Sequence, residues 1–218
     1  VNCVPCLDVK DPEGHQVIGD RAYSDNPTVV AKLGRAAADG LLAGGVLPII
    51  KHIPGHGRAS VDSHSELPIV RACGQKLVDR DFHPFQDLAD LPLGMTAHVL
   101  FSSLDPEAPG TLSEKIISQV IRQQIGFNGL LFTDDLSMQA LGGAISERTG
   151  RALKAGCDVA LHCNGQAEEM RSVAENCPLL SEQGQQRWRT ALKFRREPQT
   201  QSRNAVLAEL DRIIYPYL

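Results

Sequence analysis

The chain has 218 residues, of which 42% are hydrophobic and 22% are charged, so it can bury a core of ordinary soluble composition. Its net charge of −4 gives no reason to expect binding to nucleic acid or to an anionic membrane surface. No apolar run approaches the roughly 18 residues of a membrane span, and the first residues do not resemble a signal peptide. We therefore expect a cytoplasmic protein with a single domain over residues 1–218 and a helical tail at 181–218.

Short apolar segments alternate with amphipathic segments along the first half of the chain. Strands are predicted at 2–9, 46–50 and 93–100, and a weaker helix at 74–88. Between the first two strands lies a helix that Asn26 caps and the pair Gly44-Gly45 ends. The residues expected on its buried face are Val29, Val30, Leu33, Ala37 and Leu41.

The second half continues the same alternation. Thr111 and Glu114 have the spacing of a capping box, which predicts a helix that starts there and ends at Gly126. The remaining elements are strands at 129–133 and 158–162, helices at 144–155 and 167–175, and two helical segments in the tail.

The predicted strands are apolar throughout, which is typical of a parallel sheet covered by helices. A (β/α) barrel and an open doubly wound sheet both fit this α/β rhythm. No G-x-G-x-x-G follows a strand, which disfavours a dinucleotide-binding sheet.

Polar side chains gather after the carboxyl ends of these strands, where barrel enzymes keep their catalytic groups. One loop carries K-H-I-P-G-H-G at 51–57 and D-S-H at 62–64, and another strand ends in D-D at 134–135. The candidate site residues are Arg21, Lys51, His52, Asp62, His64, His98 and Asp134.

Structural explanations exist for each of these residues taken alone. Asp134 could be a helix N-cap, and Asp62 could form a turn with its own loop. A metal site built on His52 and His56 is disfavoured because Pro54 and Gly55 break any helix between them. The lone C-x-x-C at 3–6 has no second pair, so we expect no metal and no cofactor.

Taken together, the residues match the chemistry of glycoside hydrolysis. Retention of configuration requires a carboxylate on one face of the sugar and a proton donor at the leaving oxygen. His64 suits the second role because the imidazole pKa is near neutrality. Asp62, two residues away, can fix its tautomer. The glycines at 55 and 57 would let this loop close over a bound sugar.

The motifs at 51–57 and 62–64, and the segment F-T-D-D-L-S-M at 132–138, resemble the bacterial β-N-acetylglucosaminidases of glycoside hydrolase family 3. The resemblance covers about residues 1–165. It implies that Asp134 is the nucleophile, that His64 is the acid/base and that Asp62 supports His64. By the same resemblance, Arg21, Lys51 and His52 would grip sugar hydroxyls, and His98 occupies a matching position.

The resemblance also implies a (β/α)8 barrel of TIM type, of which this chain would supply about the last five βα units. The implied substrate is N-acetylglucosamine β-linked to anhydro-N-acetylmuramic acid, in cell-wall recycling. A phosphorylase, a metal-dependent hydrolase and an inactive sugar-binding fragment remain as alternatives. Open sheet edges would also favour self-association.

Overall fold

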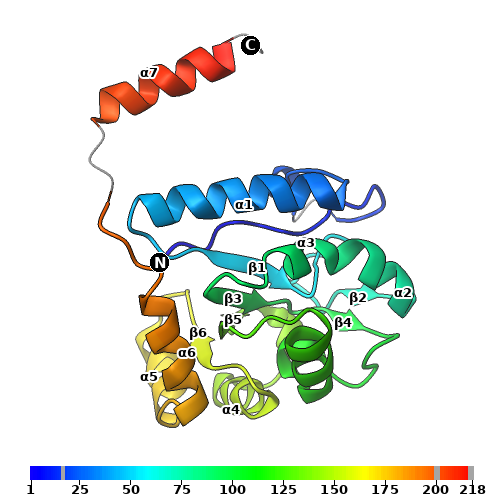
Figure 1. The fold of residues 1–218 in the computed structure, drawn as a ribbon. Coiled ribbons are helices and arrows are strands. Elements are labelled where there is room, and N and C mark those ends of the chain that lie inside the picture. The colour runs from blue at the N-terminus through cyan, green and yellow to red at the C-terminus, as the bar shows by residue number, and fades with distance from the viewer. Residues whose placement is uncertain (16–17, 199–201, 216–218) are drawn as a thin grey trace.

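The computed structural model describes residues 1–15, 18–198 and 202–215, and its centre is a parallel sheet (Figure 1). The four strands, in spatial order, are β1 (Ile49–Ile53), β3 (Leu93–Thr96), β5 (Leu130–Asp135) and β6 (Val159–Leu161). The N-terminal segment runs parallel to β1 through bridges from Asn2 to Pro48 and from Cys6 to Lys51. A separate two-stranded sheet pairs β2 (Ile69–Val70) with β4 (Leu100–Phe101).

The order of the strands distinguishes between the two architectures that the sequence allows. Neighbouring strands follow one another in chain order, whereas a doubly wound sheet reverses its order at a switch point. With helices around the sheet (Figure 1), this is the arrangement of a TIM-barrel-like α/β fold.

The helices carry the labels of Figure 1. They are α1 (Pro27–Ala43), α2 (Gly74–Lys76), α3 (His83–Asp87), α4 (Ile145–Ala155), α5 (Ala167–Glu175), α6 (Glu182–Leu192) and α7 (Arg203–Ile214). Three 3-10 turns (Gly19–Arg21, Gly110–Leu112 and Gln139–Leu141) and two π-helical segments (Leu77–Asp81 and Ile116–Gln124) complete the described elements. None of the helices in the described residues is long and apolar enough to cross a membrane.

Helix α1 confirms the predicted element but corrects its buried face. Asn26 caps it, and its side-chain oxygen accepts a hydrogen bond from the Thr28 amide at 2.9 Å. Val29 and Leu33, predicted to be buried, are 39% and 45% exposed. The buried positions are Val30, Ala31, Gly34, Ala38 and Leu42. Small residues give a weak hydrophobic signal, so the pattern favoured their larger neighbours.

The predicted capping box at Thr111 is wrong. Thr111 is fully buried, and its hydroxyl bonds the Thr96 hydroxyl at 2.8 Å and the His98 ring at 2.7 Å. The helix is instead capped by Ser113, which accepts a hydrogen bond from the Ile116 amide at 3.0 Å. The predicted helix at 74–88 is also interrupted, because α3 restarts with Pro84 in its first turn.

Two glycines of α1 provide a matched test of packing. A Cβ at Gly34 would collide with Leu7, which is fully buried, whereas a Cβ at Gly40 would meet nothing within 4 Å. We expect Gly34→Ala to destabilise the fold by about 1–3 kcal/mol through overpacking. Gly40→Ala should stabilise it by roughly 0.5–1 kcal/mol. Urea unfolding measures both, and equal stabilities for the two variants would contradict this packing.

Candidate active site

Five of the seven predicted residues meet at a cavity of about 270 Å³ near the carboxyl ends of the strands. This volume lies just below the range of about 300–1,000 Å³ for drug-sized ligands, so it fits a small ligand. Its lining consists of Cys3, Ile18, Arg21, Lys51, His52, His56, Ser63, His64, Met95, Asp134, Asp135, Met138, Leu161 and Cys163. Arg21, Lys51, His52, His64 and Asp134 are therefore brought together.

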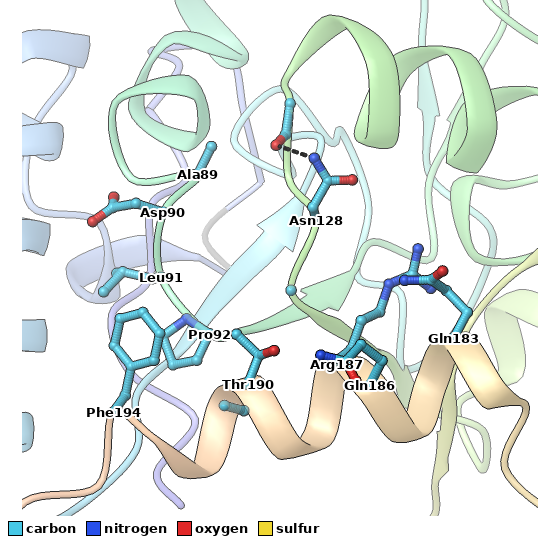
Figure 2. Close-up of a pocket in the computed structure, with 13 residues that line it drawn as sticks. Ala89, Asp90, Leu91, Pro92, Asn128, Gln183, Gln186, Arg187, Thr190 and Phe194 are labelled. Atoms are coloured by element: carbon cyan, nitrogen blue, oxygen red, sulfur yellow. Dashed lines mark hydrogen bonds between the residues drawn. The ribbon is translucent and has the colours of Figure 1, made fainter.

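A larger cavity, of about 450 Å³, lies near the opposite ends of the strands (Figure 2). It is bounded by residues that precede β3 and β5, such as Pro92 and Gly129, and by α6, which contributes Arg187. Its lining contains a single carboxylate, Asp90, and no imidazole. Barrel enzymes work at the carboxyl ends of the strands, so the smaller cavity is the better candidate.

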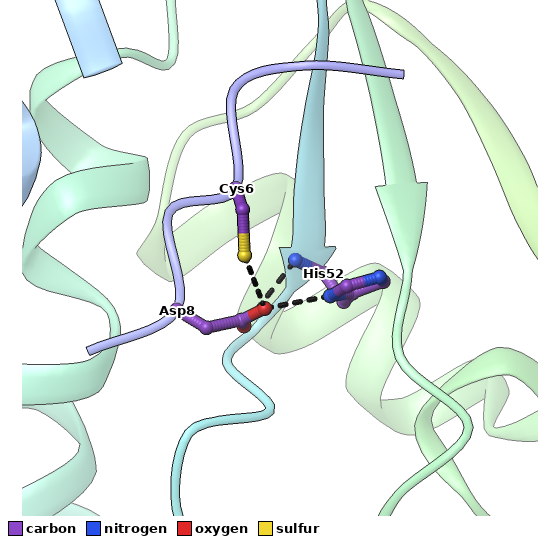
Figure 3. A group of neighbouring side chains, drawn as sticks. All are labelled: Cys6, Asp8 and His52. Carbon is purple, nitrogen blue, oxygen red and sulfur yellow. Dashed lines mark hydrogen bonds and ion pairs between the residues drawn. The ribbon is translucent and has the colours of Figure 1, made fainter. Parts of the chain in front are cut away.

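The centre of the polar network is Asp8, a fully buried residue that the sequence analysis did not select (Figure 3). Its carboxylate accepts hydrogen bonds from the backbone amides of His52 at 3.3 Å and His56 at 2.6 Å. It also bonds His52 Nδ1 at 2.6 Å and the Cys6 thiol at 3.1 Å. Burial alone would raise the pKa of Asp8, but His52 and His56 outweigh it and hold that pKa well below its usual range. Asp8 is therefore an ionised anchor for the end of β1.

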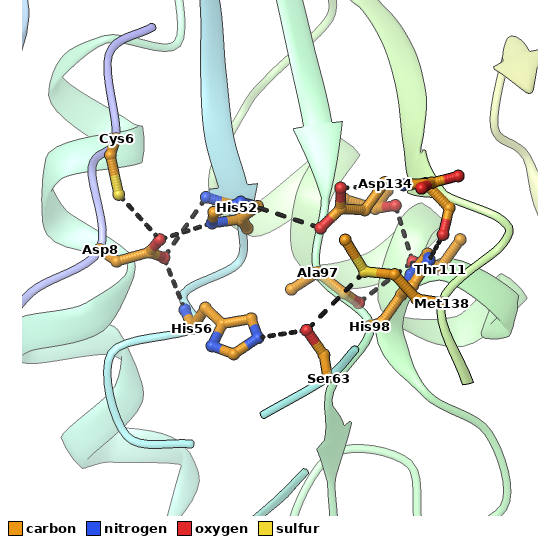
Figure 4. A network of polar contacts seen from close by, with 12 residues as sticks. Cys6, Asp8, His52, His56, Ser63, Ala97, His98, Thr111, Asp134 and Met138 are labelled. Carbon is orange, nitrogen blue, oxygen red and sulfur yellow. Dashed lines mark hydrogen bonds and ion pairs between the residues drawn. The ribbon is translucent and has the colours of Figure 1, made fainter. Parts of the chain in front are cut away.

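This anchor determines which nitrogen of His52 faces the cavity. An ionised carboxylate can only accept, so Nδ1 of His52 carries the hydrogen that Asp8 binds. His52 Nε2 then lies 3.8 Å from Oδ2 of Asp134 (Figure 4). The side chain of His52 therefore lies between the carboxylates of Asp8 and Asp134.

Asp134 lies within β5, so it is not a helix N-cap. It is 7% exposed, and its Oδ1 accepts a hydrogen bond from the Asp135 amide at 2.9 Å. Burial acts to raise its pKa, but His52, His98 and the Asp135 amide together lower the pKa below its usual value. The carboxylate is thus ionised at neutral pH, as a nucleophile must be.

The neighbouring carboxylate, Asp135, is engaged in hydrogen bonds with two other segments. Asp135 accepts hydrogen bonds from the amide and hydroxyl of Ser137, at 3.0 and 2.6 Å, and from the Cys163 amide at 3.0 Å. These bonds tie the end of β5 to the segment after β6. Asp135 is therefore held by the segments around it, and Asp134 is the candidate nucleophile of the pair.

Asp62 and His64 form the predicted pair on the loop after β1. Asp62 Oδ1 accepts from the His64 amide at 2.9 Å and lies 2.8 Å from His64 Nδ1. Its pKa is lowered, first by the hydrogen bond from the His64 amide and further by the His64 ring. Asp62 therefore forms the predicted turn with its own loop and also pairs with the imidazole of His64. Asp62 itself is not part of the cavity lining, whereas His64 is.

Hydrogen bonds hold this loop against the chain that follows β5. The carbonyls of Ser63 and His64 accept from the amides of Ala140 at 3.2 Å and Gln139 at 3.3 Å. The Ser63 hydroxyl contacts the His56 ring at 3.3 Å and the sulfur of Met138 at 3.8 Å. This docking places His64 and Asp134 around one cavity.

His98 is not brought into the cavity lining. It is fully buried, its Nε2–H donates to the carbonyl of Asp135 at 3.0 Å, and its Nδ1 bonds Thr111. Burial, which outweighs the nearby carboxylate of Asp134, lowers the pKa of His98. Its contacts are those of a group that supports the end of β5.

Comparison with known proteins places the chain in a family. Residues 1–190 match the family described as "Glycosyl hydrolase family 3 N terminal domain". The chain belongs to glycosyl hydrolase family 3. The match extends beyond the motifs recognised at about 1–165, into the predicted tail.

The curated relatives of this chain share the name Beta-hexosaminidase. A protein of Nitrosomonas eutropha named Beta-hexosaminidase is 40% identical over 168 residues, which cover 75% of this chain and 48% of that protein. The family 3 chain thus spans about half the length of the curated relatives it matches.

Two solved structures share the fold of this family 3 chain. A β-N-acetylglucosaminidase from Paenibacillus superposes with a TM-score of 0.78 at 30% identity, covering 93% of this chain and 42% of that one. NagZ from Neisseria gonorrhoeae, in complex with N-trifluoroacetyl-D-glucosamine, gives a TM-score of 0.76 at 32% identity, covering 95% and 58%.

The buried His56 should make the fold less stable in mild acid. Burial, followed by the charge of His52, lowers the pKa of His56 from 6.5 to about 4. The unfolded chain therefore binds this proton first as the pH falls from 6.5 to 4. We expect the fold to lose up to about 3 kcal/mol of stability in that window and to keep it above pH 6.5.

His56→Gln removes this contribution and should flatten the loss of stability measured by urea unfolding between pH 6.5 and 4. The matched control is His83→Gln, at a partly exposed histidine outside the cavity lining. A His56→Gln protein with the same pH slope as the parent would refute the assignment.

Proposed function

We propose that this chain carries the catalytic groups of a retaining exo-β-N-acetylglucosaminidase. The observation that carries the proposal is that the ionised Asp134 and the imidazole of His64, paired with Asp62, line one cavity of sugar size. The names of the relatives, Beta-hexosaminidase and β-N-acetylglucosaminidase, support the choice of sugar, as does the glucosamine derivative bound to the Neisseria protein.

The proposed reaction uses two displacements. Asp134 attacks the anomeric carbon while His64 Nε2–H protonates the leaving oxygen, which gives a covalent glycosyl-enzyme. His64, now neutral, then takes a proton from water as the water displaces Asp134. Asp62 holds the Nδ1 hydrogen throughout, so Nε2 remains the nitrogen that exchanges protons.

The other predicted residues have supporting roles in this proposal. Arg21 and Lys51 line the cavity and would bind sugar hydroxyls through charge-assisted hydrogen bonds. His52 presents Nε2 beside Asp134 and would orient a hydroxyl next to the anomeric carbon. His98 acts indirectly, through its bond to the carbonyl of Asp135.

The finer identity of the substrate is also a proposal. The motifs of this chain resemble enzymes that cleave N-acetylglucosamine from anhydro-N-acetylmuramic acid in cytoplasmic peptidoglycan recycling. The small volume of the cavity supports cleavage of one terminal sugar at a time. Five parallel segments would form part of a (β/α)8 barrel, completed by further polypeptide or by a second copy across the open edges.

A phosphorylase is the second candidate, because the acid/base is an imidazole and two cations line the cavity. A neutral histidine base would repel phosphate less than a carboxylate, and Arg21 and Lys51 would attract it. Incubating the protein and a β-N-acetylglucosaminide with and without phosphate distinguishes the two. Free N-acetylglucosamine in both samples supports hydrolysis, whereas N-acetylglucosamine 1-phosphate only in the first supports phosphorolysis.

Asp134→Asn should lower kcat/KM for an aryl β-N-acetylglucosaminide on the order of 10⁴-fold or more, because the amide cannot form the glycosyl ester. With a slow fluorosugar, mass spectrometry should find a covalent adduct on the peptide containing Asp134. Asp135→Asn is the matched control and should still form that adduct. An adduct on any other residue, or full turnover by Asp134→Asn, would reject the nucleophile.

His64→Ala should slow substrates with poor leaving groups by about 10²–10⁴-fold, since these need protonation. The formation of the glycosyl-enzyme from activated aryl substrates should be far less affected. Azide needs no general base, so it should restore turnover of the variant and yield a β-glycosyl azide. Equal slowing of both substrate types, with no rescue by azide, would argue against the acid/base role.

A further inference from the structure

Three groups of metal-binding type meet at the end of β1, apart from the proposed nucleophile and acid/base. They are the thiol of Cys6, the carboxylate of Asp8 and the ring of His52, whose ligating atoms all lie within 4.8 Å of one another (Figure 3). We propose that these three atoms form a binding site for a soft divalent cation of the Zn²⁺ and Cd²⁺ class. The proposal concerns binding and does not depend on the proposed glycosidase activity.

The distances between the ligating atoms suit a small ion. Cys6 Sγ lies 3.1 Å from Asp8 Oδ2, which lies 2.6 Å from His52 Nδ1. A tetrahedral zinc ion, with bonds of about 2.0 Å to nitrogen and oxygen and 2.3 Å to sulfur, needs its ligands about 3.3–3.5 Å apart. Each of these two pairs of atoms therefore has to separate by less than about 1 Å, and the third pair, Cys6 Sγ and the His52 ring nitrogen, lies within 4.8 Å. Changes in side-chain torsion angles can supply these shifts.

The donor types select a soft cation over Mg²⁺ or Ca²⁺. Thiolate and imidazole prefer Zn²⁺ and Cd²⁺, whereas Mg²⁺ and Ca²⁺ require several oxygen ligands. The cation displaces the thiol proton of Cys6 to solvent, and with neutral His52 the site becomes one divalent cation with two anionic ligands. The buried charges then cancel, as a buried ionic site requires.

Asp8 is already prepared for this role by its other oxygen. Its Oδ1 accepts the amides of His52 and His56, so the carboxylate is fixed while Oδ2 bonds the two exchangeable hydrogens. Hydrogen bonds of this kind orient a ligand and raise the affinity of a metal site.

A further buried nitrogen lies beside the cluster. Nδ1 of His56 is buried and has no hydrogen-bond partner among the described residues. The His56 ring lies 5.6 Å from the His52 ring, centroid to centroid. A water molecule would complete the tetrahedral coordination, with this nitrogen as a hydrogen-bond partner for the water.

Binding of the cation would change the chemistry of His52. Its Nδ1 hydrogen, now held by Asp8, moves to Nε2 when Nδ1 binds the metal. The nitrogen that faces Asp134 at 3.8 Å is then fixed as a hydrogen-bond donor. The site would thus couple a metal ion to the hydrogen-bonding character of the cavity.

The test uses the full chain in which the three exposed cysteines, Cys73, Cys163 and Cys177, are replaced by serine to remove adventitious thiols. Cd²⁺ is titrated while the ultraviolet thiolate-to-metal absorption is recorded, and Zn²⁺ affinity is obtained by competition. We expect one Cd²⁺ per chain with this absorption, and no competition from an excess of Mg²⁺.

Cys6→Ser is the decisive variant, because the serine hydroxyl can still donate to Asp8 and preserve the network. It should abolish the absorption and weaken Cd²⁺ binding on the order of 100-fold or more. Cys3→Ser, at the other cysteine of the C-x-x-C, is the matched control and should retain both. Absorption that persists in Cys6→Ser, is lost in Cys3→Ser, or is absent from the parent protein would overturn the proposal.

Discussion

The site depends on one buried carboxylate. Asp8 lies on the N-terminal segment, and its oxygens bind two amides and one ring on the strand end and loop that follow it. Ionised and fully buried, it would be very unfavourable without these donors. These bonds fix the position of His52 and the start of the loop that leads to His64.

The structure supports the two proposed reacting groups with different rigidity. Asp134 is held inside β5, with His98 and Asp135 bracing the same strand end. His64 lies on a loop, and its side chain is more than half exposed. Two backbone hydrogen bonds nevertheless hold this loop against the segment after β5. A nucleophile must be placed accurately relative to one carbon, whereas a proton donor must serve a departing group of variable shape. The division therefore suits the proposed glycosidase activity on substrates with different leaving groups.

The fold was predictable where local signals and tertiary packing agree. Asn26, Pro27 and the Gly44-Gly45 pair bound a helix that has those ends, and apolar runs without alternation mark the parallel strands. Predictions failed where small or polar residues acquire their role from distant partners. Ala31, Gly34 and Ala38 face the core although they are not strongly hydrophobic. The sequence predicts that Thr111 is a cap, but its hydroxyl completes a buried chain of bonds with Thr96 and His98.

The same reasoning explains what the sequence revealed of the site. Polar residues after the strand ends include Arg21, Lys51, His52, His64 and Asp134 of the cavity lining, because the carboxyl ends of parallel strands meet at one edge of the sheet. Asp62 and His98, selected by the same rule, are not in the lining. Asp8 was missed because it is embedded in an apolar segment and its partners are 44 and 48 residues away. A charged residue inside an otherwise buried strand is itself a signal, since it persists only with partners that satisfy it. Such residues identify the anchors of a site, whereas polar residues beyond the strand ends identify the groups that can meet a substrate.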